Sequence, residues 1–136
     1  MQSDDIKKAL QEIVRRLPGK KFNWRLEGSA NLLLQGVDTS VRDLDITTDD
    51  EGIEIFRHIM KDSIVSDTYD HKKYTLLSYF NGFEVDINSC GDTNLGKFDK
   101  TVIYDNIPIL PLKYAREVYQ ELGRKEKVEL IDNYFR

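Results

Sequence analysis

One stretch of the sequence, VRDLDIT at residues 41–47, alternates apolar and acidic side chains. On a β-strand, residues two apart point to the same face of the sheet. Asp43 and Asp45 therefore project together, while Leu44 and Ile46 point to the opposite face, into the core. This alternation predicts a strand with one buried face and one face that carries two neighbouring carboxylates.

A second stretch further along the chain, Phe83–Ile87, repeats the pattern. Glu84 and Asp86 share one face of this predicted strand, and the apolar residues share the other. Asn81 and Gly82 come directly before it, and this dipeptide between two apolar runs is a strong signal for a two-residue β-hairpin turn. The chain is therefore expected to present acidic side chains from two separate strands.

The other helices and strands follow from apolar spacing, turn residues and caps. We expect helices at residues 4–17, 29–35, 111–122 and 125–135, and one more helix that begins after a cap at Asp49 or Asp50. Strands are expected at residues 22–26, 41–47, 64–69, 74–80 and 83–87. A turn-rich loop is expected at 88–99, and one or two short extended pieces within 101–110. This order predicts an α/β (α+β) fold, a mixed β-sheet with helices packed on one side. A single domain is expected over residues 1–136, with a core at about 20–110 and a short C-terminal helical tail at about 111–136.

Length and composition narrow the class of protein. The 136 residues fit one domain with a single core. No apolar run reaches the roughly 20 residues that span a bilayer, so we expect no membrane segment and a cytoplasmic location. With Cys90 as the one cysteine and two histidines, His58 and His71, a zinc site is not expected. The net charge of −4 argues against a dedicated nucleic-acid coat.

The paired aspartates need a partner, because two close carboxylates repel each other and are costly to bury alone. Magnesium meets this need, since it commonly binds one or two carboxylates together with substrate phosphates. The alternative is a solvated strand face whose charges pair with Arg42 or a lysine elsewhere. Gly28 and Ser29 favour magnesium, because they lie at a predicted strand-to-helix junction where free backbone N–H groups can bind phosphate. With Asp86 as a third carboxylate, they predict a two-metal phosphoryl-transfer site.

Together these motifs resemble the signature of the DNA polymerase beta-type nucleotidyltransferase superfamily. The stretch GSANLLLQGVDTSVRDLDI carries the Gly-Ser pair, the short helix, the spacer and the Asp-x-Asp strand of that signature. The triplet VDI at residues 85–87 fits its third position, an aspartate between two hydrophobic residues. The resemblance covers residues 20–88, and ELGRKEKVELIDNYF in the tail is similar to a Gly-Arg-x-Lys stretch of small stand-alone members. It implies the nucleotidyltransferase fold.

The resemblance also implies a role for each matching residue. Gly28 and Ser29 would bind the triphosphate, and Asp43 and Asp45 would bind magnesium. Asp86 would complete a second magnesium site and act as, or near, the general base for the attacking hydroxyl. The implied reaction moves a nucleoside monophosphate from a nucleoside triphosphate, with ATP the expected donor, to a hydroxyl-type acceptor and releases pyrophosphate.

Further charged residues are candidates for assisting this site. Glu84 is either an auxiliary carboxylate beside Asp86 or a solvent-facing strand residue. The predicted tail carries a basic group made of Lys113, Arg116, Arg124, Lys125 and Lys127. Such a group is commonly a solvated helix face, and Arg124 and Lys127 are the two members expected to help bind the triphosphate. Ser29 is also expected to cap its own helix.

The acceptor stays open at this point. A small molecule such as an aminoglycoside- or lincosamide-like drug, a protein side chain or an RNA end would each fit the reaction, and the acidic net charge favours a small cationic molecule or a protein. Larger superfamily members usually carry a second domain that recognises the acceptor, and 136 residues leave almost no room for one. We therefore expect that the acceptor is small, or that a second copy of the chain or a separate helical partner protein helps to recognise it. Two other functions remain: an antitoxin-like module that neutralises a helical toxin, and a nucleotide-binding relative without catalysis.

Overall fold

The computed structural model describes residues 3–19, 21–89 and 98–136, so Cys90 and most of the predicted loop at 88–99 lie outside the described residues. The helices are α1 (Ser3–Arg16), α2 (Gly28–Leu34), α3 (Asp50–Ile59), α4 (Leu112–Glu121) and α5 (Lys125–Tyr134), with a short 3₁₀ helix η2 (Phe98–Lys100). The strands are β1 (Trp24–Glu27), β2 (Asp43–Thr48), β3 (Ile64–Asp70), β4 (Lys73–Phe80), β5 (Phe83–Ser89), β6 (Val102–Tyr104) and β7 (Ile107–Ile109). The predicted helices and strands are therefore confirmed, with small differences at their ends.

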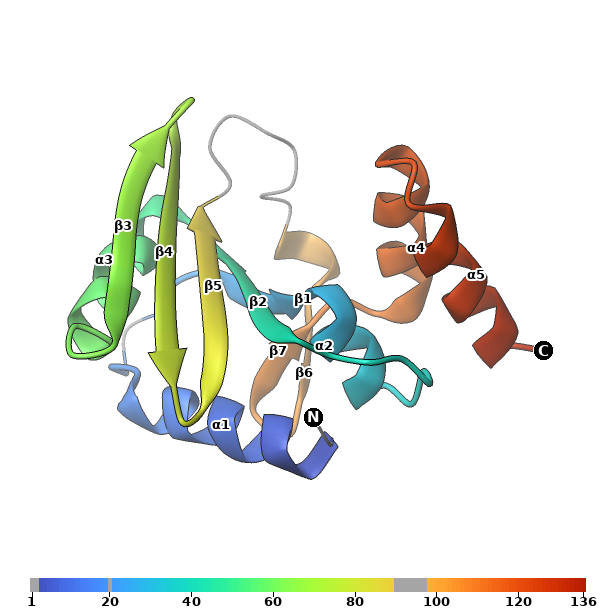
Figure 1. Ribbon diagram of the computed structural model, residues 1–136, viewed down its shortest axis with the longest axis horizontal. Helices are drawn as coiled ribbons and strands as arrows, with labels where there is room; N and C mark the ends of the chain where they lie inside the picture. Colours follow the sequence, from blue (N-terminus) through green and yellow to red (C-terminus); the bar gives the residue numbers. More distant parts are fainter. Residues whose placement is uncertain (1–2, 20, 90–97) are drawn as a thin grey trace.

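Within the described residues, seven strands form one sheet in the order β3-β4-β5-β2-β1-β7-β6. β2 pairs with β5 and β1 pairs with β7 in parallel, and the other neighbours are antiparallel. In Figure 1, β3 marks one end of the molecule and the helices α4 and α5 stand at the other. The middle of this mixed sheet is formed by β5, β2 and β1.

One face of the sheet is covered by α1, α2 and α3, whose apolar sides pack against it. Leu44 and Ile46 of β2 and Val85 and Ile87 of β5 are fully buried under these helices, together with Phe56 of α3. Each such side chain contributes about 1.5–3 kcal/mol by leaving water. The predicted alternation and the helices on one side are therefore confirmed, and the acidic residues of β2 and β5 point to the other face.

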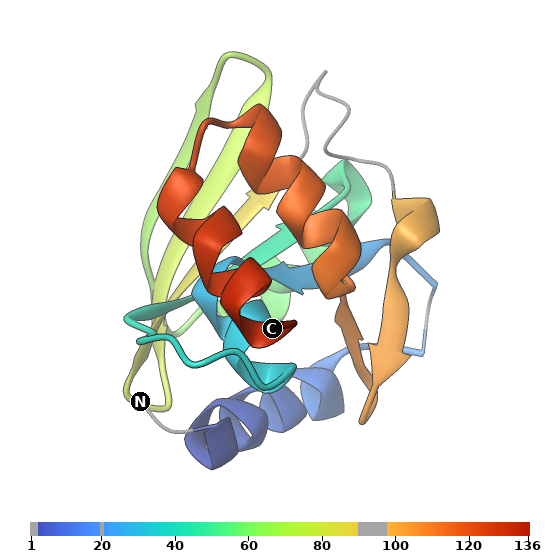
Figure 2. The same cartoon turned by 90° about the vertical axis from the view of Figure 1, so that its right-hand side faces the viewer.

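The predicted helical tail is also confirmed. α4 and α5 form a helical hairpin that a second apolar cluster attaches to the end of α2. Its members are Leu32, Val37, Leu110, Leu112, Ala115, Tyr119 and Ile131. Figure 2 shows the two tail helices in front of α2. Among the described residues, no helix has both the length and the apolar character to cross a membrane.

The local turn and cap signals have mixed outcomes. The carboxylate of Asp49 caps α3 by accepting a hydrogen bond from a backbone N–H of the first turn at 2.7 Å. Asn81 and Gly82 form the turn between β4 and β5 with φ values of 51° and 82°. The cap predicted at Ser29 is wrong, because α2 already begins at Gly28 and Ser29 lies inside it. The serine hydroxyl instead accepts a hydrogen bond from Lys127 of the tail.

Candidate active site

The strand register brings acidic side chains from three strands together on the face opposite α1, α2 and α3. β2 and β5 run parallel, so that Asp45 pairs with Asp86 and Asp43 pairs with Glu84. On the other side of β2, Glu27 of β1 pairs with Asp45. Residues paired across neighbouring strands have their Cβ atoms close together on one face. Five carboxylates therefore share a small area of the sheet.

Asp43, Asp45 and Asp86 form the tightest group within this area. One carboxylate oxygen from each lies within 4.8 Å of the others, and all three residues are half-buried. Three hard oxygen donors at this spacing are a ligand set that suits a magnesium ion. The predicted set of three aspartates is thus brought together by the fold.

Burial and mutual repulsion perturb the protonation of this group. Burial raises the pKa of Asp45 to about 6, and the charges of Asp43, Glu27 and Glu84 add to the effect. Burial also raises the pKa of Asp86, followed by its hydrogen bond with Asp43 and the charge of Glu84. Carboxylates whose ionised form is opposed by neighbouring acids favour the binding of a cation between them.

The backbone at the start of α2 approaches Asp45 closely. Gly28 has a φ of 70°, in the left-handed region that favours glycine. A Cβ atom at this position would collide with a carboxylate oxygen of Asp45 and would lie 3.2 Å from its Cγ. Gly28 therefore allows a backbone turn and a close approach at once, and either requirement alone disfavours any other residue.

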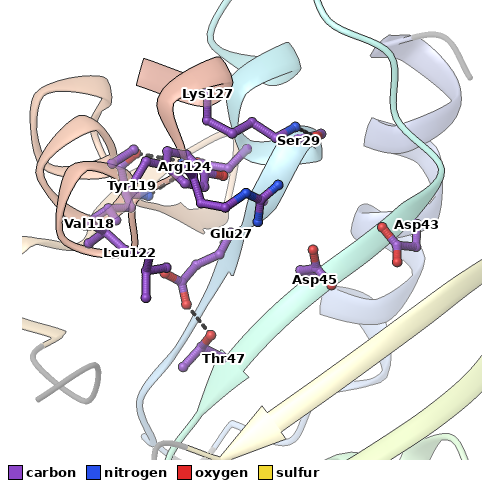
Figure 3. Close-up of a pocket in the computed structure, with 14 residues that line it drawn as sticks. Glu27, Ser29, Asp43, Asp45, Thr47, Val118, Tyr119, Leu122, Arg124 and Lys127 are labelled. Atoms are coloured by element: carbon purple, nitrogen blue, oxygen red, sulfur yellow. Dashed lines mark hydrogen bonds between the residues drawn. The ribbon is translucent and has the colours of Figure 1, made fainter. Parts of the chain in front are cut away.

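A pocket of about 350 Å³ lies between this acidic face and the tail helices (Figure 3). One side of the pocket is formed by Asp43 and Asp45 of β2 and by Gly28 and Ser29 at the start of α2, and Glu27 and Thr47 lie at one edge. Its other side is an apolar wall formed by Ala115, Val118 and Tyr119 of α4 and by Leu122, which directly follows this helix. The tail hairpin therefore completes a cavity that the sheet alone does not enclose.

Two basic residues from the tail also line the pocket, namely Arg124 and Lys127. The Lys127 ammonium group donates a hydrogen bond to the hydroxyl of Ser29, although the two residues lie 98 positions apart in the chain. Arg124 Nε donates to Glu126 Oε1 at 2.8 Å, and Figure 3 shows the Arg124 side chain extending over the pocket. The pocket therefore has cationic groups beside Ser29 and carboxylates at Asp43 and Asp45.

The carboxylate of Glu27 is held at the edge of the pocket by two donors. Thr47 Oγ1 donates to one of its oxygens, and Arg25 Nη2 donates to the other at 3.4 Å. Arg25 is itself only 3% exposed, and its guanidinium lies over the ring of Phe98 at 5.2 Å from the centroid. Glu27 is therefore a fixed negative charge next to Asp45.

Residues 9–95 match the sequence model of a family described as aminoglycoside-2''-adenylyltransferase. The match covers more than half of the chain and includes Gly28, Ser29 and the three aspartates. The chain belongs to this adenylyltransferase family. Arg124 and Lys127 lie beyond the matched residues.

Membership of the adenylyltransferase family agrees with the structural comparison. The chain is similar to a crystal structure of a putative nucleotidyltransferase from Thermotoga maritima, with 27% sequence identity and a TM-score of 0.72. The similarity covers 99% of this chain and 95% of that one. No curated protein sequence matches the chain significantly. The nucleotidyltransferase family and fold that the sequence resemblance implies are therefore confirmed.

The other predicted charged residues lie away from the pocket. Arg116 forms a bidentate ion pair with Asp132, with distances of 2.7 and 3.2 Å, and Lys113 lies over the ring of Tyr114. Lys125 is exposed and is not part of the pocket lining. These three tail residues therefore behave as a solvated helix face, the alternative that the sequence left open.

Glu84 has an intermediate position. It shares the acidic face with Asp86, as predicted, but it is not one of the three aspartates whose oxygens converge. The hydroxyl of Tyr79 donates to Glu84 Oε1 at 3.3 Å, and this carboxylate raises the pKa of Tyr79. One carboxylate oxygen of Glu84 is therefore already bound by a side chain of the neighbouring strand β4.

Several pocket residues escaped the sequence reasoning. One sequence feature could have indicated Glu27: it lies two residues after Arg25, on the same face of the strand, and directly before Gly28. No sequence feature distinguishes the apolar wall of the pocket, because residues such as Val118 and Leu122 have the spacing of an ordinary core-facing helix stripe. Tyr119 of the same wall also escaped notice; burial raises the pKa of its hydroxyl to about 12, and the negative charges of Glu27 and Asp45 contribute.

Proposed function

We propose that this protein is a magnesium-dependent nucleotidyltransferase. It transfers a nucleoside monophosphate from a nucleoside triphosphate to an acceptor hydroxyl and releases pyrophosphate, and ATP is the first donor to test because the matching family is named for adenylyl transfer. The observation that carries the proposal is the convergence of the Asp43, Asp45 and Asp86 carboxylates within 4.8 Å, beside a pocket that also contains Arg124 and Lys127.

The ligand set supports magnesium as the metal. The donors are carboxylate oxygens, and their raised pKa values reflect like charges that a divalent cation would neutralise. Asp43 and Asp45 would hold the metal on β2, and Asp86 would complete a second site from β5. Bound magnesium would neutralise charge on the triphosphate and increase the acidity of the acceptor hydroxyl.

The residues of the chain divide the remaining work. Ser29, Lys127 and Arg124 bind the terminal phosphates, and Gly28 lets the backbone approach them. The acceptor oxygen forms a bond to the α-phosphorus while the bond from the α-phosphorus to the oxygen bridging to the β-phosphorus breaks. Pyrophosphate leaves with that electron pair, and Asp86 accepts the proton of the acceptor hydroxyl.

The charge distribution supports a small acceptor that is neutral or cationic, such as an amino sugar. Glu84 and Asp86 lie on β5, which is on the side of β2 away from β1, and neither lines the pocket that holds Arg124 and Lys127. An acceptor that approaches over β5 therefore meets acidic side chains, which repel a polyanionic RNA end. The name of the matching family, which refers to aminoglycosides, agrees with this class.

The first test is isothermal titration of ATP with and without magnesium. Wild type is compared with an Asp43→Asn, Asp45→Asn double variant and with a matched Asp38→Asn, Asp62→Asn double variant, whose positions are exposed. We expect magnesium-dependent binding in wild type and in the exposed-site control, and a loss of at least about 100-fold in affinity in the metal-site variant. Wild type that binds no nucleotide in magnesium would overturn the proposal.

The acceptor is tested by transfer of label from α-³²P-ATP. Three arms contain an aminoglycoside, a transfer RNA and a protein extract, each with wild type and with Asp86→Asn. Label on the aminoglycoside that requires Asp86 would support the small-acceptor assignment, and label on RNA would refute it. The antitoxin-like module and the non-catalytic relative stay predictions, for which co-purification with a helical protein and binding without turnover are the respective tests.

A further inference from the structure

We infer that strand β6 is a dimerisation edge, at which a second copy of this chain adds its own β6 antiparallel across a twofold axis at Ile103. β6 is the last strand of the sheet, and none of the described strands pairs with its outer edge. Figure 2 shows β6 and β7, in orange, along one side of the molecule. This surface lies outside the proposed active site, because no residue of β6 lines the pocket that contains Gly28 and Asp45.

The outer edge at β6 is apolar and open. All three residues of the strand are exposed, with fractions of 45% for Val102, 66% for Ile103 and 42% for Tyr104. Sheet edges of monomeric proteins are commonly protected by charged side chains, since an open edge can pair with another strand. The opposite edge strand, β3, carries Asp67 and Asp70, whereas β6 contains no charged residue. The apolar edge at β6 is therefore the one that suits a protein partner.

The hairpin of β6 and β7 directs backbone hydrogen-bonding groups of Ile103 to this edge. Ile103 lies opposite Pro108, which has no N–H. Opposite residues of an antiparallel ladder alternate between hydrogen-bonded and non-bonded pairs, so Ile103 and Pro108 form a non-bonded pair. The N–H and C=O of Ile103 therefore point away from β7. Two copies related by a twofold axis at this residue would exchange two hydrogen bonds between these groups.

The side chains also match their own copy across this axis. One Ile103 would lie beside the other, and Val102 would lie opposite Tyr104 of the second copy, so apolar residues meet on both faces of the strand pair. Ile103 is also part of the lining of a hollow of about 330 Å³, together with residues such as Phe22 and Phe98. The isoleucine of the second copy lies next to this hollow and can cover it.

The charges at the two ends of the edge favour an antiparallel copy. The exposed residues Lys100 and Asp105 bracket the apolar strand. With Ile103 on the axis, position 100 of one copy lies opposite position 106 of the other, so Lys100 comes close to Asp105 at both ends of the pairing, and Asp99 lies one position farther from the axis. A parallel arrangement would bring like charges together. This charge complementarity favours a second copy of the chain as the partner.

The first test is analytical ultracentrifugation from about 1 to about 500 µM, the range in which weak dimers dissociate. Wild type is compared with Ile103→Lys and with the matched control Val65→Lys, whose valine is 60% exposed on the opposite edge strand β3. We expect wild type and Val65→Lys to dimerise with the same Kd. Ile103→Lys should raise that Kd at least about 100-fold, because each dimer loses two covered isoleucines. Circular dichroism checks that both variants are folded.

Cysteine cross-linking tests the position of the axis. The variants carry Cys90→Ser, so that the introduced cysteine is the only one in the chain. Hydrogen-bonded pairs have Cα atoms about 5.5 Å apart, which is within disulfide range, so Ile103→Cys should form a covalent dimer on mild oxidation. Val102→Cys should not, because its two copies would be offset by about 7 Å along the strands. Val65→Cys measures cross-linking by random collision.

Three results would overturn the inference. Wild type that stays monomeric over the whole concentration range would show that the edge does not associate with its own copy. A dimer with the same Kd in wild type and Ile103→Lys would place the interface on another surface. Cross-linking of Val102→Cys or Val65→Cys as fast as that of Ile103→Cys would contradict an axis at Ile103.

Discussion

Replacement of Asp45 by asparagine should stabilise the metal-free protein at neutral pH. Burial and the neighbouring acids raise the pKa of Asp45 to about 6 from its ordinary value of 3.8. A carboxyl group whose pKa is higher in the folded state binds its proton more tightly there than in the unfolded chain. Folding stability therefore falls as the pH rises from about 4 to about 6, and the uncharged amide of Asp45→Asn removes that loss.

The size of the effect follows from the two pKa values. The difference between 3.8 and about 6 corresponds to about 3 kcal/mol at about 1.4 kcal/mol for each tenfold change in proton affinity. Part of the carboxylate is exposed, and solvent screens its interactions, so we expect about half of this, or about 1.5 kcal/mol. In a chain of this length that amounts to about 5 °C in the melting temperature.

The assay is thermal unfolding of wild type and Asp45→Asn in EDTA, at pH 4 and pH 7.5, with the exposed Asp62→Asn as the control. The gain of Asp45→Asn should be near its full value at pH 7.5 and small at pH 4, while Asp62→Asn should be neutral at both. Added magnesium should then stabilise wild type and leave Asp45→Asn nearly unchanged, because ligand binding raises stability only where the site is intact.

Two results would contradict the expected stabilisation by Asp45→Asn. If Asp45→Asn destabilises the metal-free protein at pH 7.5, its carboxylate is already satisfied in the folded state and does not need a cation. If the gain is as large at pH 4 as at pH 7.5, it does not come from ionisation of Asp45. Either result would remove the electrostatic argument for a metal between the three aspartates.

Three further predictions concern single residues of the site. Asp86→Asn should lower the rate of pyrophosphate release by about 100-fold or more while the Kd for magnesium-bound ATP changes by less than about tenfold, measured by steady-state kinetics and titration. Gly28→Ala should cost about 1–3 kcal/mol in chemical denaturation and abolish nucleotide binding, because a methyl group meets Asp45 and φ is positive. Lys127→Met should weaken the binding of inorganic tripolyphosphate by about tenfold at low salt, and the difference from wild type should shrink at high salt because salt screens the lysine charge. The free energy of unfolding should change little.

Matched variants separate these effects from general damage. Gly82→Ala also changes a glycine with positive φ, at 82°, but has open space around the added methyl group, so it should cost less than Gly28→Ala. Lys125→Met removes a neighbouring exposed charge and should leave phosphate binding unchanged. Equal losses in Gly28→Ala and Gly82→Ala, equal losses in the two lysine variants, or an Asp86→Asn protein with full activity would each contradict the corresponding prediction.

The sequence by itself determined the local structure, because that information lies in neighbouring residues. Alternation of apolar and acidic residues determined which side of each strand carries Asp43, Asp45 and Asp86. Turn and cap residues determined the β4–β5 hairpin at Asn81 and the start of α3 after Asp49, since each satisfies a backbone requirement nearby. Local patterns do not determine the exact first residue of a helix. Because α2 begins at Gly28, one residue earlier than expected, Ser29 lies inside the helix and does not cap it.

Only the tertiary structure decided how these pieces form one site. The parallel register of β2 and β5 aligns Asp45 with Asp86 across 41 positions of sequence, and strand pairing at that separation leaves no local trace. Burial of the second apolar cluster brings Lys127 to Ser29 and selects it over equally charged neighbours such as Lys125. The same packing makes Leu122 a wall of the pocket, because long-range burial, and not the pattern along one helix, determines what its exposed side faces.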